Sequence, residues 1–290
     1  PAEQQDVMEE IASPADQDLL EKYADLWSVD MREITVLAGG SSAILLVSPG
    51  RMGIRIPVHS CASPLIREGF RETPPIRPML PDLFRSVADE LEVTVPVVLL
   101  DVDEAGQPTA KLILSGLDFN AEIPAPLGDA MTVAQRMDSI ILATPQFFDP
   151  EQSVSRAKKA LISLPRFSIP AVSFKPLQRA YEIIDMNVLE VINSRSGALI
   201  VLLVDSGHNS VLSMGVGVCE GLAIFDNLHG AQLRPAATHL MLAGLLGASG
   251  ATMTEANIVD WRDQILIGEI ELSYHGELIS IDARPSDAIA

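Results

Sequence analysis

Short aliphatic runs alternate with turn residues and predict a series of strands and helices in the first half of the chain. The run Ala43–Val47 is followed by a Ser-Pro-Gly turn and by alternating apolar and polar residues at 53–58, a pattern typical of a β-hairpin. Helical spacing of apolar residues then predicts two helices, and further apolar runs predict strands. These later segments lie at 63–70, 82–91, 97–100 and 111–114.

The second half repeats this order of elements. Its segments lie at 199–204, 211–214, 219–228, 237–246, 257–260, 265–272 and 278–281. Both halves place their helices together rather than between successive strands, which disfavours a doubly wound parallel sheet. The order predicts an α/β fold of the α+β kind, in which two similar mixed sheets are covered by helices.

Matching residues indicate that the two halves are copies of one domain. Ile123 and Asp129 correspond to Ile281 and Asp287 at a single spacing, because 281 − 123 = 158 and 287 − 129 = 158. We therefore predict a pseudo-twofold tandem duplication. The predicted parts are a helical lead (1–27), a degenerate first copy (28–140), a linker with a short helix (141–175) and a second copy (176–290).

Charge and hydropathy narrow the classes of function. The chain carries a net charge of −19 and has no run of lysine or arginine, and the second copy holds 5 arginines, no lysine and 14 acidic residues. Nucleic-acid-binding proteins usually present a basic face, so this composition disfavours tight binding of RNA or DNA. The longest apolar run, Ala198–Val204, is too short to span a membrane, and no secretory signal is visible.

The two cysteines occupy equivalent positions, because Cys61 and Cys219 are 219 − 61 = 158 residues apart. Equivalent residues of two copies point into equivalent places of two different cores. We therefore expect two buried thiols rather than a disulfide, and hence a reducing compartment and a cytoplasmic location.

The end of the second copy holds polar residues that the first copy has lost. The replaced pairs are Asp282/Pro124, Arg284/Pro126 and Ser286/Gly128, whereas Asp287 is retained as Asp129. One interpretation is structural: Ser286 or Asp287 caps a helix that begins at Pro285, and Arg284 braces Asp282. The other is a functional constraint that the first copy has escaped. The retained aspartate favours a structural cap at Asp287.

A second polar group lies upstream, at Arg234-Pro235-Ala236-Ala237-Thr238-His239. The first copy keeps the arginine as Arg77 but lacks the threonine and the histidine. His239 is either a hydrogen-bonded residue in the first turn of a helix, or a general base or metal ligand that works with nearby carboxylates. The sequence has no closely spaced set of histidines and cysteines, so a structural zinc site is not expected.

These segments resemble the bifunctional nuclease (BFN) domain family. The resemblance is carried, in order, by the apolar hairpin at 198–214, by Cys219–Ile224, by Arg234–His239 and by Ile281–Ala290. The last segment is the most specific of the four. The first copy resembles the family through the repeat.

The resemblance implies a compact α/β domain that tends to dimerise and cleaves RNA and DNA. It also suggests a Mg²⁺ or Mn²⁺ ion that carboxylates bind and that activates water. His239 would then be the general base, and the two arginines would bind phosphate. The expected catalytic residues are His239, Asp282 and Glu220; the expected substrate-binding residues are Arg234, Thr238, Arg284 and Ser286; the expected metal ligands are Asp282 and Asp260.

Two functions stay open. One is a metal-dependent nuclease, which the resemblance favours. The alternative is a non-catalytic binding or assembly module in which the copies pack as a fused pseudo-dimer, which the charge favours. We expect self-association in either case.

Overall fold

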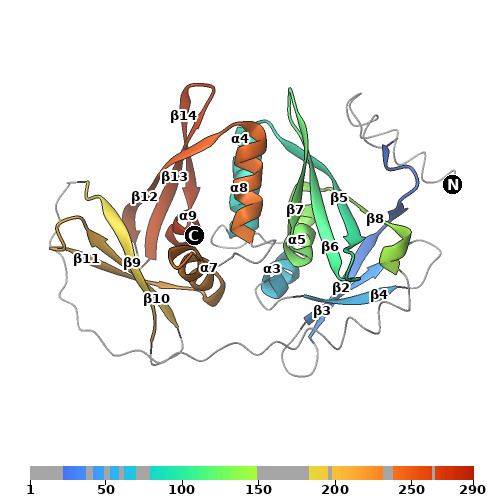
Figure 1. The fold of residues 1–290 in the computed structure, drawn as a ribbon, viewed down its shortest axis with the longest axis horizontal. Coiled ribbons are helices and arrows are strands. Elements are labelled where there is room, and N and C mark those ends of the chain that lie inside the picture. The colour runs from blue at the N-terminus through green and yellow to red at the C-terminus, as the bar shows by residue number, and fades with distance from the viewer. Residues whose placement is uncertain are drawn as a thin grey trace.

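The two copies share one order of elements in the computed structural model (Figure 1). The structure describes residues 22–36, 42–48, 53–58, 62–69, 79–148, 183–194, 198–230, 238–262 and 265–290. Each copy has three strands, two helices, three strands and a further helix. The prediction of an α+β duplication is therefore confirmed.

The first copy adds short elements at both ends of this shared order. Its elements are β1 (Trp27–Ser28), β2 (Asp30–Val36), β3 (Ser42–Val47), β4 (Ile54–Val58), α3 (Ala62–Gly69), α4 (Leu80–Glu90), β5 (Thr94–Val102), β6 (Pro108–Ser115), β7 (Asn120–Ala125), α5 (Leu127–Met137), β8 (Ile140–Ala143) and the 3₁₀ helix η1 (Pro145–Phe148).

The second copy follows the same order. Its elements are β9 (Met186–Asn193), β10 (Leu199–Asp205), β11 (Val211–Val216), α7 (Val218–Leu228), α8 (Thr238–Ser249), β12 (Thr252–Arg262), β13 (Ile265–Tyr274), β14 (Glu277–Ala283) and α9 (Pro285–Ile289). No helix among the described residues has the length and the apolar character needed to cross a bilayer.

The strands of each copy form two sheets. The first copy has the orders β1-β8-β5-β6-β7 and β2-β3-β4, and the second copy has β12-β13-β14 and β9-β10-β11. Neighbouring strands are antiparallel, except that β5 and β8 run parallel. The two sheets β5-β6-β7 and β12-β13-β14 are thus equivalent parts of the repeat.

The sequence patterns missed the strand that opens each copy. In β2, Asp30, Arg32 and Glu33 are exposed, and β9 exposes Glu190 in the same way. Both are edge strands, and charged residues on such edges interrupt the apolar run by which a strand is detected. Residues 1–21 and 149–182, which include most of the predicted lead and linker, lie outside the described residues.

The first copy also extends past its predicted end at residue 140. The apolar run Ile140–Ala143 forms β8, which pairs with β5 on one side and with β1 on the other. Trp27 lies opposite Ala143 in this pairing. The segment just before the first copy therefore contributes to its main sheet.

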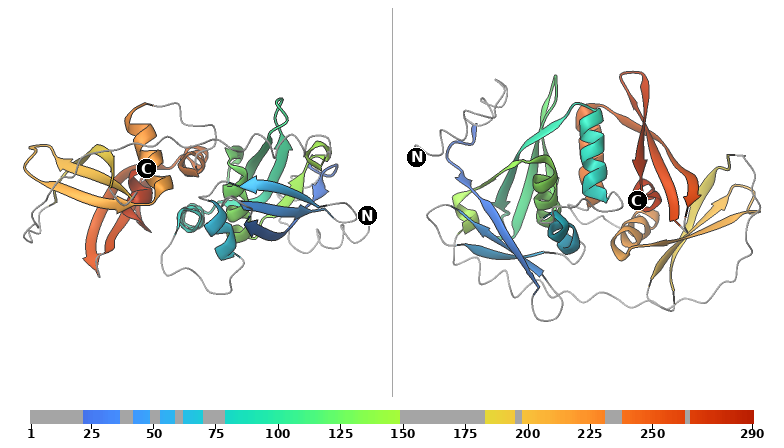
Figure 2. Two further views of the ribbon diagram at one scale, coloured as in Figure 1. Left: turned by 90° about the horizontal axis from the view of Figure 1, so that it is seen from below. Right: turned by 180° about the vertical axis from the view of Figure 1, so that it is seen from behind.

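Each copy places one helix against the main sheet of the other copy, an arrangement that we call the helix exchange. α4 of the first copy packs against β14 of the second, and α8 of the second copy packs against β7 of the first. The two helices also contact each other, and Figures 1 and 2 show them side by side between the two sheets. Each main sheet is thus covered in part by a helix from the other copy.

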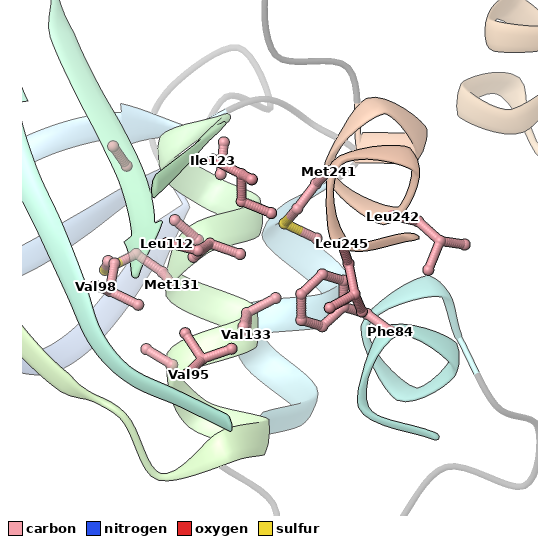
Figure 3. Close-up of a cluster of buried hydrophobic side chains, with 14 of the residues drawn as sticks. Phe84, Val95, Val98, Leu112, Ile123, Met131, Val133, Met241, Leu242 and Leu245 are labelled. Atoms are coloured by element: carbon pink, nitrogen blue, oxygen red, sulfur yellow. The ribbon is translucent and has the colours of Figure 1, made fainter. Parts of the chain in front are cut away.

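One hydrophobic core joins the two copies at these helices. Phe84 of α4 and Ile123 of β7 belong to the same buried cluster as Met241 and Leu245 of α8. Figure 3 shows Met241 directed toward Ile123, and Leu245 beside Phe84. The inward-facing residues of β13 and β14 complete the cluster from the second copy; they are Ile270, Leu272, Ile281 and Ala283.

Candidate functional site

The site begins where β14 gives way to α9. Ile281 and Ala283 alternate inward along β14, and Arg284 then occupies the N-cap position of α9, with extended backbone. Pro285 follows as the first helical residue, a position at which its missing N–H costs nothing. This start brings Asp287, the third helical residue, into the interior, where its side chain is only 1% exposed.

Arg284 binds the carboxylate of Asp287 with two hydrogen bonds. Its Nε donates to Oδ2 at 2.6 Å, and its Nη2 donates to Oδ1 at 2.9 Å. Burial opposes the charge of the guanidinium, but the hydrogen bonds and charges of Asp287 and Glu220 outweigh it, so the pKa of Arg284 is raised above its usual value. The guanidinium therefore stays charged beside the carboxylate of Asp287.

Asp287 is not the helix cap that the sequence predicted. No side-chain cap hydrogen bond forms at the start of α9, and the carboxylate accepts hydrogen bonds from the guanidinium instead. The predicted brace between Arg284 and Asp282 is likewise replaced by the pair of Arg284 with Asp287 and Glu220.

Glu220 joins the site from the first turn of α7. Its Oε1 accepts a hydrogen bond from Nη2 of Arg284 at 2.8 Å, and both side chains are less than a quarter exposed. The carboxylate folds back over Gly217, the N-cap residue of α7, where a Cβ would collide with Oε2 of Glu220. A glycine at 217 therefore makes room for the carboxylate that faces Arg284.

His239 joins the site from α8. Its Nε2 lies 3.8 Å from Oδ1 of Asp287. This nitrogen is buried and forms no hydrogen bond with any described residue. The His239 side chain as a whole is 15% exposed. The imidazole thus places Nε2 toward a buried carboxylate, and part of the side chain stays accessible.

Several predicted residues lie elsewhere. Asp282 is exposed on β14 and points away from the inward face that Ile281 and Ala283 occupy. Asp260, on β12, accepts a hydrogen bond from the backbone of Trp261 at 2.6 Å. Ser286 is half-buried in α9.

Two further residues of the predicted site are not placed. Arg234 lies outside the described residues. Thr238 begins α8, but its side chain is not described. The four residues that the structure does bring together are Arg284, Asp287, Glu220 and His239.

A divalent metal does not fit the described residues. The guanidinium of Arg284 occupies the place between Asp287 and Glu220 where a cation would have to sit. In the part of the chain that the structure describes, no three or more His, Cys, Asp or Glu side chains are arranged to hold a metal ion. The expected Mg²⁺ or Mn²⁺ ligands Asp282 and Asp260 are on β14 and β12, apart from this group.

Cys219, next to Glu220, overturns another expectation. It is disulfide-bonded and half-buried, so the prediction of a buried thiol is wrong at this position. The only other cysteine of the chain, Cys61, lies outside the described residues. A disulfide also removes the argument for a reducing compartment, which rested on free thiols.

The sequence contains features that indicate the ion pair of Asp287, although the prediction made from them was a helix cap. Asp287 and Asp129 are the retained pair of the repeat, and each is buried. A buried carboxylate needs a cation or several donors, and the nearest arginine in the chain is three residues away, within reach on a helical start. This spacing indicates a buried ion pair at least as well as a cap.

The chain matches a family model described as the bifunctional nuclease domain. The match covers residues 43–155 and 200–290, so both copies are recognised, including the one that lost its polar residues. No curated protein is similar enough to count as a relative. Because the matched segments make up more than half of the sequence and agree with the two structural copies, the chain belongs to the bifunctional nuclease domain family.

Proposed function

We propose that the second copy binds a phosphodiester of RNA or DNA and hydrolyses it, with Arg284 as the phosphate-binding cation and His239 as the proton acceptor. The observation that carries this proposal is the convergence of Arg284, Asp287, Glu220 and His239 from three helices. Membership of the bifunctional nuclease domain family supports a nuclease-like domain.

Arg284 keeps donors for a phosphate. Its bonds to Asp287 and Glu220 use Nε and Nη2, while Nη1 forms no hydrogen bond with the described residues. The two N–H groups of Nη1 suit a phosphate oxygen, and a guanidinium held from one side loses little freedom on binding. The N-terminal turns of α7 and α8 lie at the same place through Glu220 and His239, and helix N-termini favour anions.

His239 has the surroundings of a general base. A carboxylate near one imidazole nitrogen stabilises the imidazolium that forms when the other nitrogen takes up a proton. Asp287 is that carboxylate for Nε2, at 3.8 Å, and Nδ1 is the nitrogen left to take up the proton. In the proposed reaction Nδ1 accepts the proton of the attacking hydroxyl or water, whose oxygen forms a bond to phosphorus. The bond from phosphorus to the leaving oxygen breaks, and that oxygen takes up a proton from solvent.

Each step of the proposed reaction uses side chains of this chain, and no step passes through a metal. A dependence on Mg²⁺ or Mn²⁺ stays a prediction from the family resemblance. The net charge of −19 means that long-range attraction does not favour a polyanion, so binding depends on contacts at the site itself.

Cleavage of labelled single-stranded RNA and DNA tests the proposal, with Mg²⁺, Mn²⁺ or EDTA in parallel samples. Wild-type protein is expected to cleave, and His239→Gln is expected to lower the rate about 100-fold because a general base is lost. His229→Gln is the matched control, since His229 is exposed at the end of α7. Equal cleavage by all three proteins would indicate a contaminant and reject the proposal.

An assembly module is the second candidate, and the helix exchange favours it. A core shared by two copies is the arrangement of an obligate dimer, and it requires no catalysis. Absence of cleavage, together with loss of phosphate binding in Arg284→Lys, would support a binding module. Absence of both cleavage and phosphate binding would support assembly alone.

A further inference from the structure

We infer that the degenerate first copy positions the histidine of the second copy's site, through the contact of Ile123 on β7 with Gly244 on α8. This inference rests on the proposed function only for the consequence on cleavage. Ile123 and Gly244 are positioning residues in this scheme, and neither touches the substrate.

The site consists of two parts with different supports. α9 carries Arg284 and Asp287 and packs on β12, β13 and α7 of its own copy, and α7 carries Glu220. α8 carries His239 and packs on β7 and α4 of the first copy, and on β12. The distance of 3.8 Å between His239 and Asp287 therefore spans a junction between the two copies.

The first copy anchors α8 closely. Met241 and Leu245 are 1% and 0% exposed, in one cluster with Ile123 and Phe84 (Figure 3). Side chains this well packed do not shift independently of the helix that carries them. The position of α8 is thus fixed by the sheet and the helix of the first copy.

Gly244 faces Ile123 in this contact. A Cβ at position 244 would lie 3.3 Å from Cγ2, 3.4 Å from Cβ and 3.5 Å from Cδ1 of Ile123. The shortest of these spacings is tighter than an ordinary van der Waals contact, so an alanine there requires the Ile123 side chain or α8 to shift by a few tenths of an ångström. Because Ile123 is packed in the buried cluster, we expect α8 to move. His239 lies only five residues earlier on the same helix, and a helix transmits such a shift along its axis.

Gly247 provides a matched control on the same helix. A Cβ at 247 would meet nothing within 4 Å. Gly247→Ala therefore repeats the chemical change of Gly244→Ala, including the gain in helix propensity, without the contact to the first copy.

The experiment records the His239 ring resonances in a two-dimensional NMR spectrum, assigned by their loss in His239→Gln. Gly244→Ala is expected to shift these resonances and Gly247→Ala to leave them unchanged. In parallel, kcat for cleavage should fall about tenfold in Gly244→Ala while KM changes little, because misplacement of a reacting group by a fraction of an ångström acts on the chemical step. Gly247→Ala should match the wild type.

Rescue separates the contact from a local effect on the helix. Ile123→Ala in the Gly244→Ala background removes the opposing methyl groups and should return the ring resonances toward the wild-type position. If Gly244→Ala does not fold, Ile123→Val alone tests the same contact, because it removes Cδ1 without adding an atom, and it too should shift the His239 resonances.

Two results would overturn the inference: His239 resonances that are unchanged in Gly244→Ala and Ile123→Val, or resonances that shift equally in Gly244→Ala and Gly247→Ala. A protein that cleaves nothing defeats the proposed function but not this inference, since the ring resonances report the position of His239 without any substrate.

Discussion

The start of α9 in the second copy and the start of α5 in the first are equivalent regions with different interiors. Both helices follow an edge strand of the main sheet, and both bury an aspartate in the first turn, Asp287 and Asp129. In the second copy the next helix over, α7, contributes Glu220 and the N-cap contributes Arg284. The buried aspartate is thus common to both copies, whereas Arg284 and Glu220 are replaced by Pro126 and Ala62 in the first copy.

In the first copy, small residues replace two polar residues of the second copy, and the helices that carry them pack in direct contact. Ala62 and Gly128 stand where the second copy has Glu220 and Ser286, and a Cβ at Gly128 would lie 2.5 Å from Cβ of Ala62. α3 and α5 therefore pack against each other directly. The comparison indicates that loss of the polar residues was accompanied by small residues that let the helices approach.

The largest expected effect comes from removing the cation. Arg284→Met leaves the buried carboxylate of Asp287 without its partner, and the free energy of unfolding should fall by about 3 kcal/mol, because an uncompensated buried charge is costly. Urea unfolding measures the change.

Arg136→Met in the first copy sharpens this comparison. Arg136 Nε donates to Asp82 at 2.7 Å, but Asp82 also accepts a hydrogen bond from the backbone of Met79 at 2.8 Å. Its carboxylate keeps a partner, so the loss should be about 1 kcal/mol. Equal losses in the two variants would contradict the distinction between the copies.

An intermediate effect is expected when a second-copy residue is placed in the first copy. Gly128→Ser adds atoms against Ala62 in a packed helix contact, and we expect a loss of about 2 kcal/mol in the free energy of unfolding from overpacking. The reverse change, Ser286→Gly, should cost only about 1 kcal/mol, the helix propensity of glycine. Chemical denaturation of both variants measures these losses. A Gly128→Ser variant with unchanged free energy of unfolding would contradict direct packing of α3 against α5.

The smallest expected effect is on the pH dependence of stability, and it concerns Glu122 and Lys111 of the first copy. Glu122 on β7 lies beside Lys22 and Lys111, and their hydrogen bonds lower its pKa to about 2 from 4.5. A lowered folded-state pKa stabilises the fold above the unfolded-state value, and this contribution is lost as pH falls from 4.5 toward about 2. The second copy has Ser280 and Glu269 at the positions of Glu122 and Lys111 and lacks this charge pair.

Glu122→Gln should therefore lower the free energy of unfolding by about 0.5 kcal/mol at neutral pH, since the pair is partly exposed and screened. The difference from wild type should vanish in acid. Thermal unfolding across this pH range tests it, with Glu277→Gln at the exposed start of β14 as the control. A difference that persists in acid would mean that packing, not charge, is responsible.

The strand-to-helix junction of the second copy was predictable in part. The proline at 285 predicted the start of α9, whereas the strand predicted to end at Ile281 continues to Ala283. The alternation around Ile281 excludes Asp282 from the interior, because a residue between two inward-facing ones points outward. Glu220 was missed as a partner of Arg284, since α7 is distant in sequence.

The helix exchange was not predicted, although α8 carried a hint. Its sequence, Thr-His-Leu-Met-Leu-Ala-Gly-Leu-Leu-Gly-Ala-Ser, is apolar almost all round, and such a helix has neighbours on several sides. The pattern indicates burial but not which sheet provides it. That choice depends on how the two copies pack, which local spacing does not contain.

The exchange of α4 and α8 has a consequence for how the molecule comes apart. Either copy on its own would expose the apolar strip that the other copy's helix covers, so neither is a self-sufficient folding unit. The two copies should unfold in a single cooperative transition. If the chain is cut between them, the two copies should stay bound to each other.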